Sequence, residues 1–230
     1  MSKTVLTDKT VFEITRFTTL DYANNLACIL WFSKCNMACQ YCYNADIVRG
    51  IGRYTNQEIL DFLKSRVGKL TGVVLSGGEC TLYPHLIELC EEIKELGFKI
   101  KIDTNGLRPD VLQELIDFSL VDFIALDYKA PSYKFYEITN NNSNEKFYKT
   151  LDMLIDKEFP FEVRTTVHSH LLESKDINQI ILDLKERKYR GTYYLQNFLH
   201  VENTLGNLDI PSVSIDKKLL LDDIPIEVRN

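Results

Sequence analysis

Apolar, β-rich runs alternate with segments of helical periodicity about six times along the 230-residue chain. Six runs are predicted as strands: residues 26–33, 72–79, 98–106, 121–129, 161–168 and 191–198. Helices are predicted between them; Thr55 and Glu58 have the spacing of a capping box, and Pro109 suits a first helical turn. Such alternation is typical of parallel strands with right-handed crossovers. We therefore predict an α/β fold, a partial (β/α)6 TIM-like barrel, with its chemistry at the carboxyl ends of the strands.

The composition favours one domain that spans residues 1–230. With 45% hydrophobic and 26% charged residues, the chain has enough apolar surface for one core. A net charge of −6 without a dense Lys/Arg cluster argues against nucleic-acid binding. Residues 1–25 lack the apolar core of a signal peptide, and no apolar run reaches the ~18 residues of a membrane span. We expect a cytoplasmic protein that does not enter a membrane.

Three of the six cysteines lie in one short loop after the first predicted strand. Cys35, Cys39 and Cys42 have the spacing C-x3-C-x2-C, which allows one loop to wrap a metal cluster. Three thiolates on four irons leave one iron open to bind a substrate. The alternative is a structural zinc site whose fourth ligand is a histidine or one of the other cysteines: Cys28, Cys80 and Cys90. The spacing alone leaves both kinds of site open.

Two further features, combined with this spacing, resemble the radical S-adenosylmethionine superfamily. Tyr41 places an aromatic side chain directly before the third cysteine, and "SGGE" (76–79) follows the second predicted strand. The resemblance covers about residues 11–200 and leaves a C-terminal tail, residues 207–230, which we expect to pack on the barrel. It implies a [4Fe-4S] cluster on Cys35, Cys39 and Cys42 whose open iron binds S-adenosylmethionine. One electron from the cluster would then cleave the cofactor to a 5'-deoxyadenosyl radical.

The same resemblance assigns a cofactor shell at the strand ends. It consists of Tyr41, Gly77, Gly78, Glu79, Asp103, Asn105, Asp127, Lys129 and His200. Tyr41 would contact the adenine, and Glu79 would orient the amino group beside the two glycines. "DTNG" (103–106) and "LDYK" (126–129) would lie beside the methionine moiety, where Lys129, together with a bound monovalent ion, offsets the aspartates. His200 would bind the ribose. Each feature also has an explanation that needs no cofactor: the two glycines form a turn, Asp127 and Lys129 form an ion pair at the barrel rim, and Tyr41 packs in the core.

Within the superfamily, "CQYCYNADIV", "DTNG" and "LDYK" resemble the activating enzymes of glycyl-radical enzymes. "YLQNFLHVENTLG" resembles the activase of anaerobic ribonucleoside-triphosphate reductase in particular. The resemblance implies abstraction of a glycine hydrogen in that partner, or in pyruvate formate-lyase, with reduced flavodoxin as electron donor and no catalytic residue beyond the cluster and cofactor ligands. Two positions depart from the pattern of these activases: Tyr43 stands where they often have histidine, and Cys80 where proline is common.

Two other functions stay open. One is a radical S-adenosylmethionine synthase that acts on a small molecule, in the manner of 7-carboxy-7-deazaguanine synthase. The other is a non-catalytic protein that binds an iron–sulfur cluster or zinc.

Overall fold

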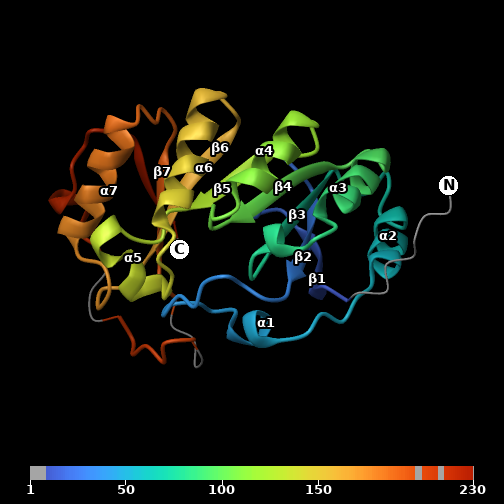
Figure 1. Ribbon diagram of the computed structural model, residues 1–230, viewed down its shortest axis with the longest axis horizontal. Helices are drawn as coiled ribbons and strands as arrows, with labels where there is room; N and C mark the ends of the chain where they lie inside the picture. Colours follow the sequence, from blue (N-terminus) through green and yellow to red (C-terminus); the bar gives the residue numbers. More distant parts are fainter. Residues whose placement is uncertain (1–8, 200–203, 212–214, 230) are drawn as a thin grey trace. The chain divides into compact units, whose positions relative to one another are not determined.

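The structure is a computed structural model that describes residues 9–199, 204–211 and 215–229. Strands and helices alternate along most of the chain (Figure 1). The chain divides into two compact units. Unit 1 consists of Met1–Cys35, Asp46–Thr104 and Asp110–Ile124; unit 2 consists of Asn36–Ala45, Asn105–Pro109 and Ala125–Asn230. Strand β5 (Phe123–Asp127) begins in unit 1 and ends in unit 2.

The sheet of unit 1 starts with one antiparallel pair and continues with parallel strands. Its strands are β1 (Val11–Thr18), β2 (Ala27–Phe32), β3 (Gly72–Gly77) and β4 (Lys99–Thr104). β1 pairs with β2 antiparallel, whereas β2, β3 and β4 pair parallel in chain order. β2 and β3 are buried along nearly their whole length, as their continuous apolar runs predict.

Two helix ends in this half of the chain, the start of α2 and the end of α3, carry signals visible in the sequence. They are α1 (Ala45–Arg49), α2 (Asn56–Lys64), the 3-10 turn η1 (Cys80–Leu82), α3 (Leu86–Glu95) and α4 (Pro109–Asp117). The capping box before α2 is confirmed, since Thr55 Oγ1 accepts from Glu58 N and a Glu58 carboxylate oxygen accepts from Thr55 N at 2.8 Å. Gly97 follows the end of α3 with a φ of +85°, which suits glycine.

Unit 2 continues the parallel pattern. Its strands after β5 are β6 (Phe161–Val167), β7 (Tyr193–Asn197) and β8 (Ile226–Arg229), and each pairs parallel with the next. Its helices are α5 (Ser132–Thr139), α6 (Asn144–Asp156), α7 (Ser174–Glu186) and the 3-10 turn η2 (Lys217–Leu219). The tail supplies β8, where Arg229 lies 3.3 Å above the Tyr194 ring and pairs with Glu162. The tail is thus part of the sheet edge.

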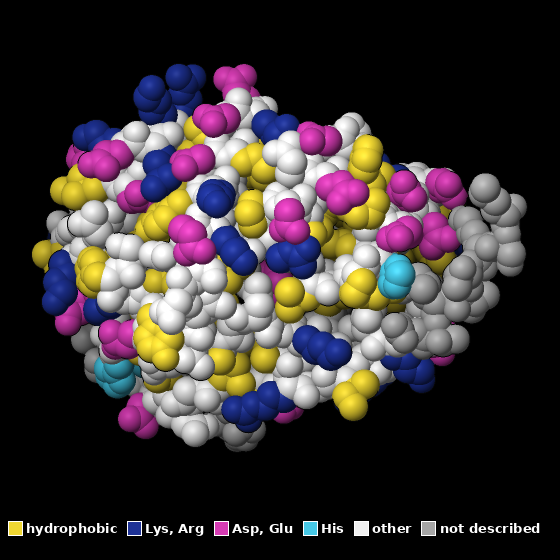
Figure 2. Space-filling view, in the orientation of Figure 1, with side chains coloured by type: hydrophobic (Ala, Val, Ile, Leu, Met, Phe, Trp, Pro, Cys, Tyr) yellow, Lys and Arg dark blue, Asp and Glu magenta, His cyan; other side chains and the backbone are white. Residues whose placement is uncertain are grey.

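The predicted fold class is confirmed. The six predicted strands correspond to β2 through β7, and the fold is α/β with parallel strands, of the partial (β/α)6 type. β1 and β8 are additions that the sequence analysis did not predict. None of the described helices has the length and apolar character that a bilayer crossing requires. Figure 2 shows charged side chains of both signs interspersed with hydrophobic ones on the viewed face.

Candidate active site

The three loop cysteines follow β2 directly. Cys35 is the last residue of the first segment of unit 1, and Cys39 and Cys42 belong to unit 2. All three are free thiols, and Cys39 is buried. Burial raises the pKa of the Cys39 thiol to about 11, with a smaller opposing effect from the Lys129 ammonium. In the described part of the chain, no three His, Cys, Asp or Glu side chains are already placed to hold a metal ion. Cluster ligation therefore stays a prediction.

The backbone of the cysteine loop is held by hydrogen bonds within unit 2. Ala38 N donates to Thr139 O at 2.9 Å, and Gln40 N donates to Ile138 O at 3.0 Å, so the loop runs along the end of α5. On its other side, Gly206 N donates to Gln40 O at 2.9 Å. A loop with its backbone bonded on two sides loses less entropy when it binds a ligand. The thiolates are thus carried on a pre-organised loop.

Asn36, directly after the first cysteine, is held by two other asparagines. Asn105 Nδ2 donates to Asn36 Oδ1 at 2.7 Å, and Asn141 Nδ2 donates to Asn36 O at 2.8 Å. Asn105 is buried, and its own Oδ1 accepts from Leu107 N at 3.0 Å. The predicted cofactor residue Asn105 thus has a contact with the cysteine loop, which the sequence analysis did not anticipate.

We expect Asn141→Ala to loosen the loop and speed loss of bound iron. The substitution removes the bond to Asn36 O and a second bond, in which Asn141 Oδ1 accepts from Ser143 N at 2.7 Å; each is worth about 1 kcal/mol. The measurement is the rate at which a chelator strips iron from the anaerobically loaded protein, and a several-fold increase is expected. Asn142→Ala is the matched control, because Asn142 is exposed. Equal rates in the two variants would show that the Asn141 contact does not hold the loop.

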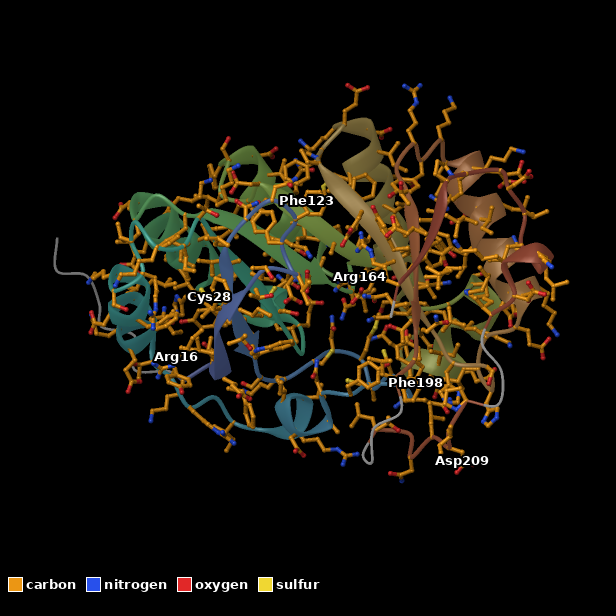
Figure 3. All side chains as sticks on the ribbon, turned by 180° about the vertical axis from the view of Figure 1, so that it is seen from behind. Arg16, Cys28, Phe123, Arg164, Phe198 and Asp209 are labelled. Carbon is orange, nitrogen blue, oxygen red and sulfur yellow. The ribbon has the colours of Figure 1, made fainter. Side chains whose placement is uncertain are left out.

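The two tyrosines beside the third cysteine have different surroundings. Tyr41 is buried, and its hydroxyl donates to Lys129 O at 3.4 Å. Tyr43 stacks on Phe198 with ring centroids 5.0 Å apart, and its hydroxyl accepts from Leu199 N at 2.7 Å. Figure 3 labels Phe198 beyond the end of β7. Tyr43 therefore connects the cysteine loop with the segment that follows β7, and this contact explains why residue 43 is aromatic.

In unit 1, the two glycines of "SGGE" allow close approach to the chain just before Cys35. Gly78 N donates to Phe32 O at 2.8 Å, and a Cβ on Gly78 would lie 1.9 Å from Lys34 O. Gly77 has a φ of +116°, and a Cβ there would lie 2.5 Å from the Phe32 backbone. No side chain fits at either position. This close backbone contact alone explains why glycine stands at both positions. The predicted approach of a cofactor is a second, separate reason.

Glu79 and Asp103 lie at the ends of β3 and β4. Glu79 is 1% exposed, and one carboxylate oxygen accepts from the hydroxyls of Thr81 at 2.6 Å and Thr104 at 2.9 Å. Asp103 accepts from Ser76 Oγ at 3.0 Å and lies 3.3 Å from Lys101 Nζ. Both carboxylates are thus fixed in orientation, and Asp103 has a cation partner of its own in unit 1.

A cluster of three charged side chains lies at the end of β5. Asp127 accepts from Lys129 Nζ at 2.9 Å and from Arg164 Nε on β6. Burial alone would raise the pKa of Asp127, but the Arg164 guanidinium and the Lys129 ammonium outweigh it and hold the pKa at about 2. Figure 3 labels Arg164 on its strand. Two cations share one carboxylate here, so the cluster has a net positive charge and suits an anionic group.

Arg164 is a candidate site residue that the sequence analysis missed. The sequence did offer a signal for it. Arg164 is a charged residue inside the predicted strand "FEVRTTVH", and the predicted strand before it ends in "LDYK", which contains an aspartate. The predicted His200 lies outside the described residues. His168, fully buried, has its Nε2 2.9 Å from Asp209 O and its ring against Phe198, so it is part of the core.

The remaining cysteines are buried in unit 1. Cys28 lies on β2, as Figure 3 shows, Cys80 lies in η1, and Cys90 lies on α3. Burial raises the pKa of all three thiols, that of Cys28 and Cys90 to about 12. They behave as small apolar side chains in the core.

These features define a class: α/β proteins of the partial (β/α)6 type with three thiols on the loop after the first parallel strand. A family model described as the Radical SAM superfamily matches residues 29–184. The chain belongs to the radical S-adenosylmethionine superfamily.

Three comparisons refine this assignment. The protein named "Putative glycyl-radical enzyme activating enzyme MJ1227", from Methanocaldococcus jannaschii, is 33% identical over 189 residues, which cover 76% of this chain and 75% of that protein. The 7-carboxy-7-deazaguanine synthase of Neisseria meningitidis is 33% identical over 97 residues, 42% of this chain and 41% of its own. The structure of Streptococcus suis SuiB bound to S-adenosylmethionine matches with a TM-score of 0.67 at 14% identity, which shows a shared fold. The match covers 86% of this chain but about half, 48%, of SuiB.

Proposed function

We propose that this chain is an activase that uses S-adenosylmethionine to remove a hydrogen atom from a glycine of a glycyl-radical enzyme. The observation that carries the proposal is the extent of similarity. The activating-enzyme relative matches over 76% of the chain, whereas the deazaguanine synthase matches over 42%. A match over most of the chain favours a shared overall reaction, whereas a match over less than half supports only the shared chemistry.

The residues present fit an iron–sulfur cluster and S-adenosylmethionine. Cys35, Cys39 and Cys42 would hold a [4Fe-4S] cluster, because they give three soft thiolate donors on a braced loop. When bound, the cluster supplies one electron for cleavage of the sulfonium cofactor. In this proposal residues 1–230 act as one radical S-adenosylmethionine domain.

The proposed contacts with S-adenosylmethionine use the residues that the family resemblance assigns, with Arg164 added. The net positive cluster of Lys129, Arg164 and Asp127 would bind the carboxylate of S-adenosylmethionine, and the Glu79 carboxylate would accept from its amino group. Gly77 and Gly78 would bring backbone groups to the same moiety, beside Asp103. Further members of the proposed shell are Tyr41 at the adenine, Asn105 at the methionine moiety and His200 at the ribose.

The favoured partner is anaerobic ribonucleoside-triphosphate reductase, followed by pyruvate formate-lyase, with reduced flavodoxin as electron donor. The test uses anaerobically reconstituted protein, a reductant, S-adenosylmethionine and the reductase from the same organism. We expect an electron paramagnetic resonance doublet from a glycyl radical that requires all four components. A reductase variant with alanine in place of the radical glycine is the control and should give no doublet.

A second candidate, a synthase acting on a small molecule, is favoured by the match to 7-carboxy-7-deazaguanine synthase. Formation of 5'-deoxyadenosine without a doublet, together with turnover of a small substrate in the absence of any partner, would replace the activase by this synthase. An intact cluster with neither product would leave a non-catalytic iron–sulfur protein. Zinc in place of iron in the purified protein would indicate a structural site.

A further inference from the structure

We infer that the surface formed by Lys34, Arg49, Ile51 and Arg53 is the docking site for an acidic one-electron donor protein. We call it the basic surface. The inference rests on the proposed function, because only a cluster that cycles between oxidation states needs such a donor. All four side chains are exposed. Within the described residues, none of these three cations forms an ion pair, and the one acidic residue of α1, Asp46, is exposed.

The basic surface is one contiguous part of unit 1. Lys34 N donates to Ile47 O at 3.3 Å, which joins the start of the cysteine loop to α1. The Arg53 guanidinium lies 3.9 Å above the Phe12 ring, and Gly50 packs against the same ring. Figure 2 shows Lys and Arg side chains on the lower part of the viewed face, where α1 lies in Figure 1. Residue 34, α1 and residues 50–53 therefore surround the start of β1.

The charge of this surface selects the partner. The whole chain has a net charge of −6, so an acidic protein is repelled at long range and attracted only where cations gather. Complementary charge of this kind mainly raises the association rate. Ile51 lies between Arg49 and Arg53 in the sequence and is 80% exposed, and an exposed apolar residue near charged ones is typical of protein interfaces. The surface thus suits a short-lived complex with an acidic protein.

The position of the basic surface suits electron transfer. Lys34 directly precedes Cys35, the first predicted cluster ligand, so a protein docked on Lys34 contacts the residue next to that ligand. In the transfer, the reduced cofactor of the donor loses one electron and the cluster gains it, with no bond formed or broken. A small reductant such as dithionite needs no docking surface, which separates docking from chemistry in an experiment.

The test compares two triple variants of the reconstituted protein, with reduced flavodoxin as the probe. Lys34→Glu/Arg49→Glu/Arg53→Glu reverses the basic surface; Lys146→Glu/Lys149→Glu/Arg190→Glu reverses three exposed cations elsewhere, so both variants have the same net charge. We expect the first variant to bind flavodoxin at least 10-fold more weakly by calorimetry, and to lose most of the salt dependence of binding. Cleavage of S-adenosylmethionine driven by flavodoxin should slow by a similar factor, while cleavage driven by dithionite is unchanged.

Each outcome decides between the alternatives. Equal flavodoxin affinity in the two triple variants would overturn the inference, as would binding of RNA or anionic vesicles by the basic surface when flavodoxin does not bind. If dithionite supports no cleavage even in the unmodified protein, the proposed function fails, whereas the calorimetric comparison still tests the surface. Arg49→Glu alone serves as a second variant in case the triple variant does not fold. If this single charge reversal binds flavodoxin as tightly as the unmodified protein does, the inference is overturned.

Discussion

Cys39→Ala is expected to leave the protein without its iron and without cleavage of S-adenosylmethionine. Three thiolates are the minimum that holds a four-iron cluster with one open iron, so two remaining thiolates cannot retain it. Cys39 is the buried member of the three, and the loop backbone on both sides of it is fixed by hydrogen bonds to the end of α5. Because this position is buried and the loop backbone is fixed, neither a water molecule nor another side chain can easily take the place of the lost sulfur. The iron content should fall from about four per chain to background, and 5'-deoxyadenosine formation by at least 100-fold.

Cys90→Ala is the matched control for this prediction. Cys90 is also a buried free thiol, but it lies on α3 in unit 1, away from the loop in the chain. Its loss should cost about 1 kcal/mol of stability and leave the iron content unchanged. Full iron content in the Cys39 variant, or equal iron loss in both variants, would show that the ligand assignment is wrong.

The sequence predicted those parts of the fold that local patterns determine. Continuous apolar runs indicated β2 through β7, and Thr55 with Glu58 indicated the start of α2. β1 was missed because its sequence, VFEITRFT, has neither a continuous apolar run nor a regular apolar/polar alternation, and most of its residues are exposed or partly buried. β8 was missed because it is four residues long and is defined by its pairing with β7, about 30 residues earlier in the chain.

The candidate site was predictable where one segment carries the signal and unpredictable where distant segments combine. The three cysteines and "SGGE" are local motifs, so they were found in the sequence. Arg164 and Asp127 are 37 residues apart, and Asn36 bonds partners 69 and 105 residues away. Such contacts depend on strand order, which a pattern in one segment does not report. The same holds for Tyr43, whose stacking on Phe198 depends on the segment after β7.

Asp127→Asn is expected to destabilise the protein by about 3 kcal/mol, because it leaves two largely buried cations without their shared carboxylate. The Asp127, Lys129 and Arg164 side chains are 21%, 17% and 15% exposed, so water screens them only in part. Asparagine keeps the volume of the side chain, so the loss reports charge rather than packing. The measurement is the free energy of unfolding from anaerobic urea denaturation without added S-adenosylmethionine.

Two variants test the cause of this loss. Asp61→Asn removes an exposed carboxylate that pairs with Lys64 at 3.5 Å, and it should change stability by about 0.5 kcal/mol or less. Adding Arg164→Met to Asp127→Asn removes one of the two unpaired cations and should recover part of the stability. A double variant less stable than Asp127→Asn would show that Arg164 stabilises the fold without the carboxylate, contrary to the proposed cause.

The pH dependence of stability follows from the same carboxylate. The pKa of Asp127 in the folded protein is about 2, below the usual value of 3.8, so the ionised form stabilises the fold. This contribution is complete above the unfolded pKa and is lost as the pH falls through about 2. The difference in unfolding free energy between the unmodified protein and Asp127→Asn should therefore be constant above about pH 5 and shrink from about pH 4 towards pH 2. A difference that stays constant down to pH 2 would mean that lost packing, and not the two cations, causes the destabilisation.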